Sequence, residues 1–118
     1  MAQDLPSAAD LLAACRGFLE GDVMDALTGR LRFHTRVVAN VLGVVERELR
    51  DGPVADAAEL AGLVALLGHD GDIGELNAEL AARIRDGSLD ERRAEVLTHV
   101  RETVEAKVRI SNPGYLRE

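Results

Sequence analysis

Apolar and polar positions alternate along most of this chain with the period of an α-helix, and turn residues divide the pattern into segments. Ser7 and Asp10 have the spacing of a capping box before the first segment, which ends at Gly21. Residues 51–53, Asp-Gly-Pro, form a stop signal between the second segment and the third. We therefore predict five helices, over residues 7–21, 30–50, 54–67, 73–86 and 88–111.

The predicted helix over residues 30–50 has the widest apolar side. Its apolar residues cover about half of the helical circumference: Phe33, Val37, Val38, Val41, Leu42, Val44, Val45 and Leu49. The opposite side is a polar ridge of Arg32, Arg36, Asn40, Gly43, Arg47 and Arg50. So wide an apolar arc predicts a central helix that several others contact, with His34 inside the arc as a core histidine bonded to a carbonyl.

The same periodicity predicts the buried side of the other helices. The apolar neighbours of Cys15 predict a packed thiol in a reducing compartment. The third helix is expected to bury Ala57, Leu60, Ala61, Val64 and Leu67, and the fourth Ile73, Leu76, Leu80 and Ile84. For the fifth, which Ser88 and Glu91 are expected to cap, the inner stripe is Leu89, Leu97, Val100, Val104 and Val108.

Composition agrees with an all-α, single-domain bundle over residues 1–118, with an N-terminal arm at 1–6 and a C-terminal tail at 112–118. Hydrophobic residues make up 47% of the chain and aromatic residues only 3%, so aliphatic side chains must fill the interior. A net charge of −7 opposes broad contact with nucleic acid. We also expect a cytoplasmic protein without a membrane segment, because neither a signal-peptide pattern nor a sufficiently long apolar run is present.

The densest group of chemically capable side chains lies at the start of the second predicted helix. Arg30, Arg32, Arg36 and Asn40 form the candidate binding site, because guanidinium groups bind phosphate or carboxylate bidentately. The same residues could instead be a solvated face that pairs with acidic side chains of a neighbouring helix. We expect no metal site and no cofactor, since His69 and His99 lack ligand spacing. Helix capping and turn chemistry explain the acidic loop of Asp70, Asp72 and Glu75.

Four sequence blocks together resemble an uncharacterised bacterial family of small all-helical domains of unknown function. The blocks are Gly29-Arg30-Leu31-Arg32-Phe33-His34-x-Arg36-Val37-x-x-Asn40, Leu66-Leu67-Gly68-x-Asp70-Gly71-Asp72, Leu76-Asn77-x-Glu79-Leu80 and Asn112-Pro113-x-Tyr115. The resemblance implies an association with aminoglycoside-phosphotransferase-like kinases and acyl-CoA dehydrogenases. It implies no activity and no catalytic residue.

We therefore expect a noncatalytic accessory module that contacts a kinase-like or acyl-CoA-dehydrogenase-like protein, with self-association left open. Its contact surface would be the ridge of Arg32, Arg36 and Asn40 or the apolar remainder of the last helix. The alternative function is a helical bundle that holds an anionic ligand, such as the phosphates of an acyl-CoA or a nucleotide, through these arginines. No motif for an independent enzyme is present.

Overall fold

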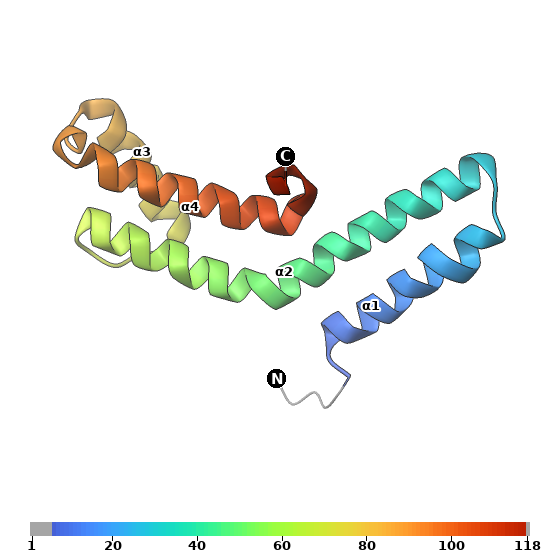
Figure 1. The fold of residues 1–118 in the computed structure, drawn as a ribbon. Coiled ribbons are helices and arrows are strands. Elements are labelled where there is room, and N and C mark those ends of the chain that lie inside the picture. The colour runs from blue at the N-terminus through green and yellow to red at the C-terminus, as the bar shows by residue number, and fades with distance from the viewer. Residues whose placement is uncertain (1–5, 118) are drawn as a thin grey trace. The chain divides into compact units, whose positions relative to one another are not determined.

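A computed structural model describes residues 6–117, and this part of the chain is all-α with no strand. Its four α-helices are α1 (Ala8–Phe18), α2 (Gly29–Leu67), α3 (Ile73–Asp86) and α4 (Arg93–Ser111) (Figure 1). A π-helical turn, Leu19–Val23, follows α1, and 3₁₀ turns at Asp90–Arg92 and Pro113–Arg117 flank α4. The predicted fold class is confirmed, and the predicted break at residues 112–114 ends α4.

The prediction of five helices is wrong, because residues 51–53 do not interrupt α2. Pro53 lies inside a continuous helix of 39 residues. A proline normally disfavours helical backbone at the preceding residue, because the proline Cδ clashes with the Cβ of that residue. The preceding residue here is Gly52, which has no Cβ, and this reduces the steric cost of continuing the helix through Pro53.

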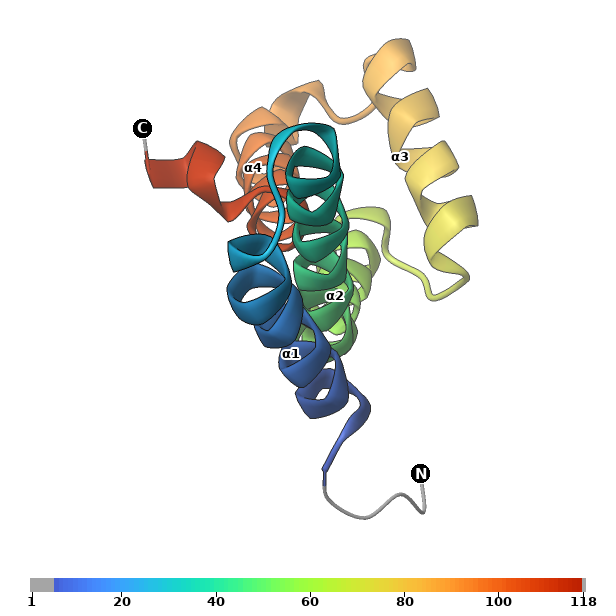
Figure 2. The ribbon, with the colours of Figure 1, turned by 90° about the vertical axis from the view of Figure 1, so that its right-hand side faces the viewer.

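The chain divides into two compact units, the first of which comprises residues up to Pro53 together with Ile110–Asn112. In this unit α1 lies beside the N-terminal part of α2 (Figures 1 and 2). The predicted capping box is present at the start of α1. The predicted helix end at Gly21 is wrong, since the π-helical turn continues through that residue. The connection into α2 uses Gly29 at φ 63°, a conformation that favours glycine.

The second unit comprises Val54–Arg109 and the residues from Pro113 onward, and it contains the main apolar core. The core residues are Leu63, Leu66, Leu67, Leu76, Leu80, Leu89 and Val96. Asp72 caps α3 by accepting a hydrogen bond from the Glu75 backbone N–H (3.3 Å), and Gly87 ends the helix at φ 82°, both as predicted. The chain forms two compact units, but one continuous helix, α2, belongs to both of them. The prediction of one domain over residues 1–118 therefore stays a prediction.

Several residues predicted to be buried are exposed. Cys15 is exposed, as is His34, whose ring meets Phe33 edge to face with centroids 5.7 Å apart. Ala57, Ala61, Ile84, Leu97, Val100 and Val104 are also exposed. Ser88 does not cap the last helix, because its hydroxyl donates back to the Arg83 carbonyl (3.4 Å). Except for the Ser88 cap, these errors concern which side of a helix is buried and not where the helices lie in the sequence.

Residues 1–5 of the predicted N-terminal arm lie outside the described residues. Within the part that is described, no helix combines the length and the apolar character that crossing a membrane requires.

Candidate functional site

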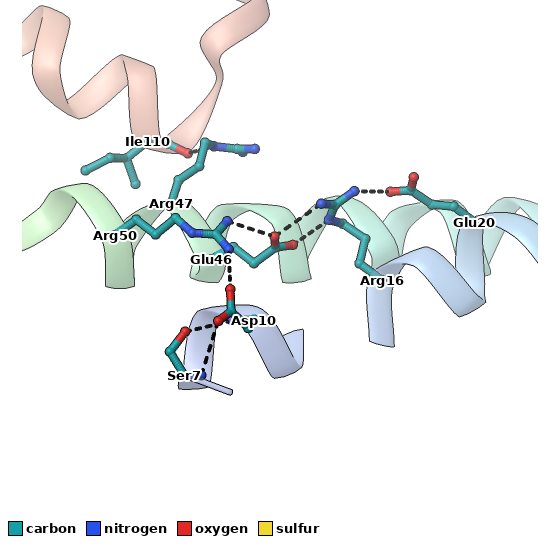
Figure 3. A network of polar contacts seen from close by, with 8 residues as sticks. All are labelled: Ser7, Asp10, Arg16, Glu20, Glu46, Arg47, Arg50 and Ile110. Carbon is teal, nitrogen blue, oxygen red and sulfur yellow. Dashed lines mark hydrogen bonds and ion pairs between the residues drawn. The ribbon is translucent and has the colours of Figure 1, made fainter. Parts of the chain in front are cut away.

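The first unit is held together by a buried carboxylate between α1 and α2. Glu46 of α2 is only 3% exposed, and it accepts two hydrogen bonds from Arg16 of α1. One joins Arg16 Nη2 to Glu46 Oε1 (3.2 Å), and the other joins Nε to Oε2 (Figure 3). Arg50, one turn along α2, donates from Nη1 to Oε1 (3.4 Å). A buried carboxylate requires such partners, because an unpaired charge away from water is costly.

The network continues to the N-terminus of α1. Arg50 Nη2 pairs with Asp10 Oδ1 at 3.3 Å, and the other oxygen of Asp10 accepts the Ser7 backbone N–H at 3.2 Å. Arg16 also pairs with Glu20 on its own helix at 3.1 Å. Capping and ion pairing therefore share one carboxylate, Asp10, and fix the position of α1 along α2 (Figure 3).

Electrostatics keep these groups charged. Hydrogen bonds from Arg16 lower the pKa of Glu46. Conversely, the carboxylates of Glu46 and Glu20 raise the pKa of Arg16. The Ser7 backbone N–H is the largest cause of the lowered pKa of Asp10, and Arg50 adds to it. A carboxylate saturated by two arginines is a poor general base, since its proton affinity is reduced. The network is therefore a structural clamp.

The four residues of the predicted site all lie on α2 and differ in their surroundings. Arg32 donates from Nη1 to the Met24 carbonyl and so ties the start of α2 to the preceding turn. Arg36 and Asn40 are exposed, and their side chains form no hydrogen bond or ion pair among residues 6–117. Arg30 is exposed and lies on the opposite side of the helix from Arg32, because two residues correspond to about 200°.

Gly43 and Arg47 of the polar ridge are less exposed than Arg36 and Asn40, whereas Arg50 is exposed and pairs with Asp10 of α1. Gly43 is buried, and an added Cβ there would lie 3.6 Å from Arg16 Cδ. Arg47 donates from Nε to the Ile110 carbonyl (2.7 Å) within the same unit (Figure 3). Ala39, on the same side, is 1% exposed. Small residues at positions 39 and 43 let α1 approach closely, and the arginines around them reach polar partners.

The predicted core side of α2 is correspondingly exposed. We call it the α2 outer face, and it comprises five apolar residues at a spacing of four: Phe33, Val37, Val41, Val45 and Leu49. Their exposed fractions run from 40% to 63%. Within this unit the prediction that this arc is the buried side of the helix is wrong, because the buried residues are Ala39 and Glu46 instead.

A second exposed apolar row lies on α4 in the other unit. We call Leu97, Val100 and Val104 the α4 outer stripe, and they are 54%, 39% and 51% exposed. They were predicted to be part of the inner stripe of this helix. The structure buries Leu89 of that predicted stripe, just before α4, and on α4 itself it buries Val96 in the core. His99 is half-buried and lies against α2, where an added Cβ on Gly62 would come within 2.3 Å of His99 Nδ1.

Sequence reasoning missed two buried acidic residues. Besides Glu46, Glu59 of α2 is 7% exposed and contacts Asn77 Nδ2 (3.0 Å) and Lys107 Nζ (3.5 Å). Acidic residues in an exposed helix and in a buried ion pair look alike in a helical projection. The signal for Glu46 was the neighbouring pair of small residues, Ala39 and Gly43, which indicates a close helix contact.

The acidic loop behaves as capping and turn chemistry predict. Asp70 Oδ1 accepts the Gly71 backbone N–H (2.8 Å), and Asp72 caps α3. His69 Nε2 lies 2.8 Å from Glu79 Oε1, and this contact is the largest cause of the raised pKa of His69. Among residues 6–117 no group of three His, Cys, Asp or Glu side chains is placed to hold a metal ion.

Comparison with known proteins identifies the family of the chain. A family model described as "Domain of unknown function (DUF6285)" matches residues 25–115, which include all of α2, α3 and α4. The chain therefore belongs to this family, as its four sequence blocks predict. No curated protein and no solved structure matches it.

Proposed function

We propose that this member of the DUF6285 family is a noncatalytic interaction module that binds a protein partner through the α4 outer stripe. The observation that carries the proposal is the exposure of Leu97, Val100 and Val104 on a unit that already has a closed apolar core. Contiguous exposed apolar rows are typical of surfaces that contact another protein.

The geometry of the stripe suits a helix-in-groove contact. Its residues are spaced by three and four positions, so they lie on one side of α4. Removing them would take nothing from the described core, which Leu63 and Leu76 fill from α2 and α3. The three residues of the stripe are therefore not needed to form the core of this unit.

The partner class follows from the family resemblance. The resemblance implies an association with aminoglycoside-phosphotransferase-like kinases and acyl-CoA dehydrogenases, so we propose that the partner is a protein of one of these classes. We propose that the chain contributes no catalytic group to that assembly, in keeping with a polar cluster around Glu46 that is saturated by internal contacts.

Purified kinase-like and dehydrogenase-like proteins from the same host provide the test. We expect one of them to bind the full chain in calorimetry, and Val100→Glu to weaken binding at least about tenfold, because a buried unpaired charge costs more than 1.4 kcal/mol. Ile84→Glu is the matched control, since Ile84 is an equally exposed apolar residue on α3. Binding by neither class, or equal losses in both variants, would contradict the proposal.

The alternative function, binding of an anionic ligand through the arginines, has less support. Of the candidate residues only Arg36 and Asn40 share a side of α2 and remain available, while Arg32 is already bonded to Met24. Titration with coenzyme A would favour this alternative if it gave saturable binding that Arg36→Ala abolishes.

A further inference from the structure

The α2 outer face points away from the fold of its own unit. Val41, at its centre, lies about 160° around the helix from Ala39, which is buried against α1. On the side opposite the buried Glu46 and its arginine partners, α2 thus carries five exposed apolar residues. They are not packed in the interior of this unit, as far as the structure describes it. Exposing such a row to water is unfavourable by about 25 cal/mol per Å² of apolar surface, so the row is suited to burial by a partner.

We propose that the α2 outer face binds the same face of a second copy of this chain, with the two helices antiparallel. A spacing of four residues forms one continuous ridge along a helix. A two-fold dimer supplies the same ridge twice. The surface therefore fits itself without a separately shaped partner.

Charge complementarity selects the antiparallel arrangement. Arg30 and Glu48 lie at opposite ends of the α2 outer face and are both exposed. They are 18 positions apart, or about five helical turns, so they lie on one line along the helix. Neither forms an ion pair with another of the described residues. In an antiparallel pair each Arg30 faces the other copy's Glu48, whereas a parallel pair would bring like charges together.

The apolar residues share the same centre of symmetry. The midpoint between Arg30 and Glu48 falls at the level of residue 39, and Val37 and Val41 lie at equal distances on either side of this level. Phe33 and Val45 are likewise equidistant from it. One two-fold axis therefore places apolar residues opposite apolar residues and opposite charges opposite each other. The acidic Glu48 argues against a membrane surface as the occupant of this face, because helices that lie on membranes favour basic residues beside their apolar side.

Sedimentation equilibrium of the full chain tests the dimer. We expect a species of twice the 12.7 kDa chain mass, and we expect Val41→Glu to convert it to a monomer with unchanged helical circular dichroism. Val100→Glu, on the α4 outer stripe, is the matched control and should leave the dimer intact. This control also separates the present inference from the proposed function, because the two surfaces lie on different helices. A monomeric wild-type chain, or a dimer that Val41→Glu does not affect, would overturn the inference.

A charge exchange tests the antiparallel register. Arg30→Glu and Glu48→Arg should each weaken the dimer about tenfold or more, and the double variant should recover most of the lost affinity. Failure of the double variant to recover would refute the proposed pairing. A Cys15→Ala, Val41→Cys variant provides a second readout, since a short bis-maleimide should link its two copies only if their α2 outer faces meet.

Discussion

At the scale of single residues, the structure distinguishes arginines that hold the fold together from those that remain available. Arg16 bonds the buried Glu46, and Arg32 bonds the Met24 carbonyl. Arg36, one turn after Arg32 on α2, is exposed and unpaired among the described residues. Their roles could not be predicted from the sequence, because a helical projection shows which residues share a side and not what that side contacts.

Replacement of Arg36 should therefore have little effect on folding. We expect Arg36→Ala to change the free energy of unfolding by no more than about 0.5 kcal/mol, as is usual for an exposed side chain. Urea denaturation measures this. A loss of about 3 kcal/mol would show instead that Arg36 is the partner of a buried carboxylate.

The buried Glu46 should behave in the opposite way. Glu46→Gln removes the charge that Arg16 and Arg50 share, and we expect it to cost about 1–3 kcal/mol of stability at neutral pH. Glu20→Gln is the matched control, because Glu20 pairs with the same Arg16 at an exposed position, and it should cost no more than about 0.5 kcal/mol.

The same substitution has a defined pH dependence. Because Arg16 lowers the pKa of Glu46 below its ordinary 4.5, this carboxylate stabilises the fold above that pH. The contribution is lost as the pH falls through the lower pKa of the folded state. Stability of the wild type should therefore fall more steeply below pH 4.5 than that of Glu46→Gln, in denaturation measured at several pH values. Parallel curves would contradict the lowered pKa.

At the scale of helices, capping signals predicted several of the helix ends, whereas periodicity misplaced the buried sides of α2 and α4. The capping box at Ser7, the N-cap at Asp72 and the helix end at Gly87 are where the sequence places them, since each depends only on neighbouring residues. The buried side depends on what packs against the helix. On α2 the small residues Ala39 and Gly43 are buried, whereas the wider apolar arc is exposed. The small side chains allow α1 to approach closely near the buried Glu46.

Close approach also explains a glycine in the second half of α2. Gly62→Ala would place its Cβ 2.3 Å from His99 Nδ1, so we expect it to destabilise the protein although alanine favours helices. Gly17→Ala is the matched control, since nothing lies within 4 Å of its added Cβ, and it should stabilise α1 by about 0.5–1 kcal/mol. Combining Gly62→Ala with His99→Ala should remove most of the penalty in thermal unfolding. Stabilisation by Gly62→Ala alone would contradict the α2–α4 contact.

At the scale of the whole molecule, the two units differ in how they use apolar residues. The second unit buries six of its leucines in a core of its own. The first unit buries a polar clamp and leaves its larger apolar residues, Phe33 and Val41 among them, exposed. Sequence analysis assumed that the widest apolar arc faces the interior of the same chain. That assumption fails when the surface that covers the arc belongs to another molecule, as we propose for the α2 outer face.

The orientation of α2 is the central claim, and paired substitutions on its two sides test it most directly. Ala39→Glu places a charge at a position that is 1% exposed, whereas Val41→Glu places it at one that is 56% exposed. In urea denaturation at low protein concentration, where association contributes least, we expect Ala39→Glu to lose about 3 kcal/mol or more and Val41→Glu no more than about 0.5 kcal/mol. The reverse order, with residue 41 intolerant and residue 39 tolerant, would show that the apolar arc faces inward after all and would contradict the account.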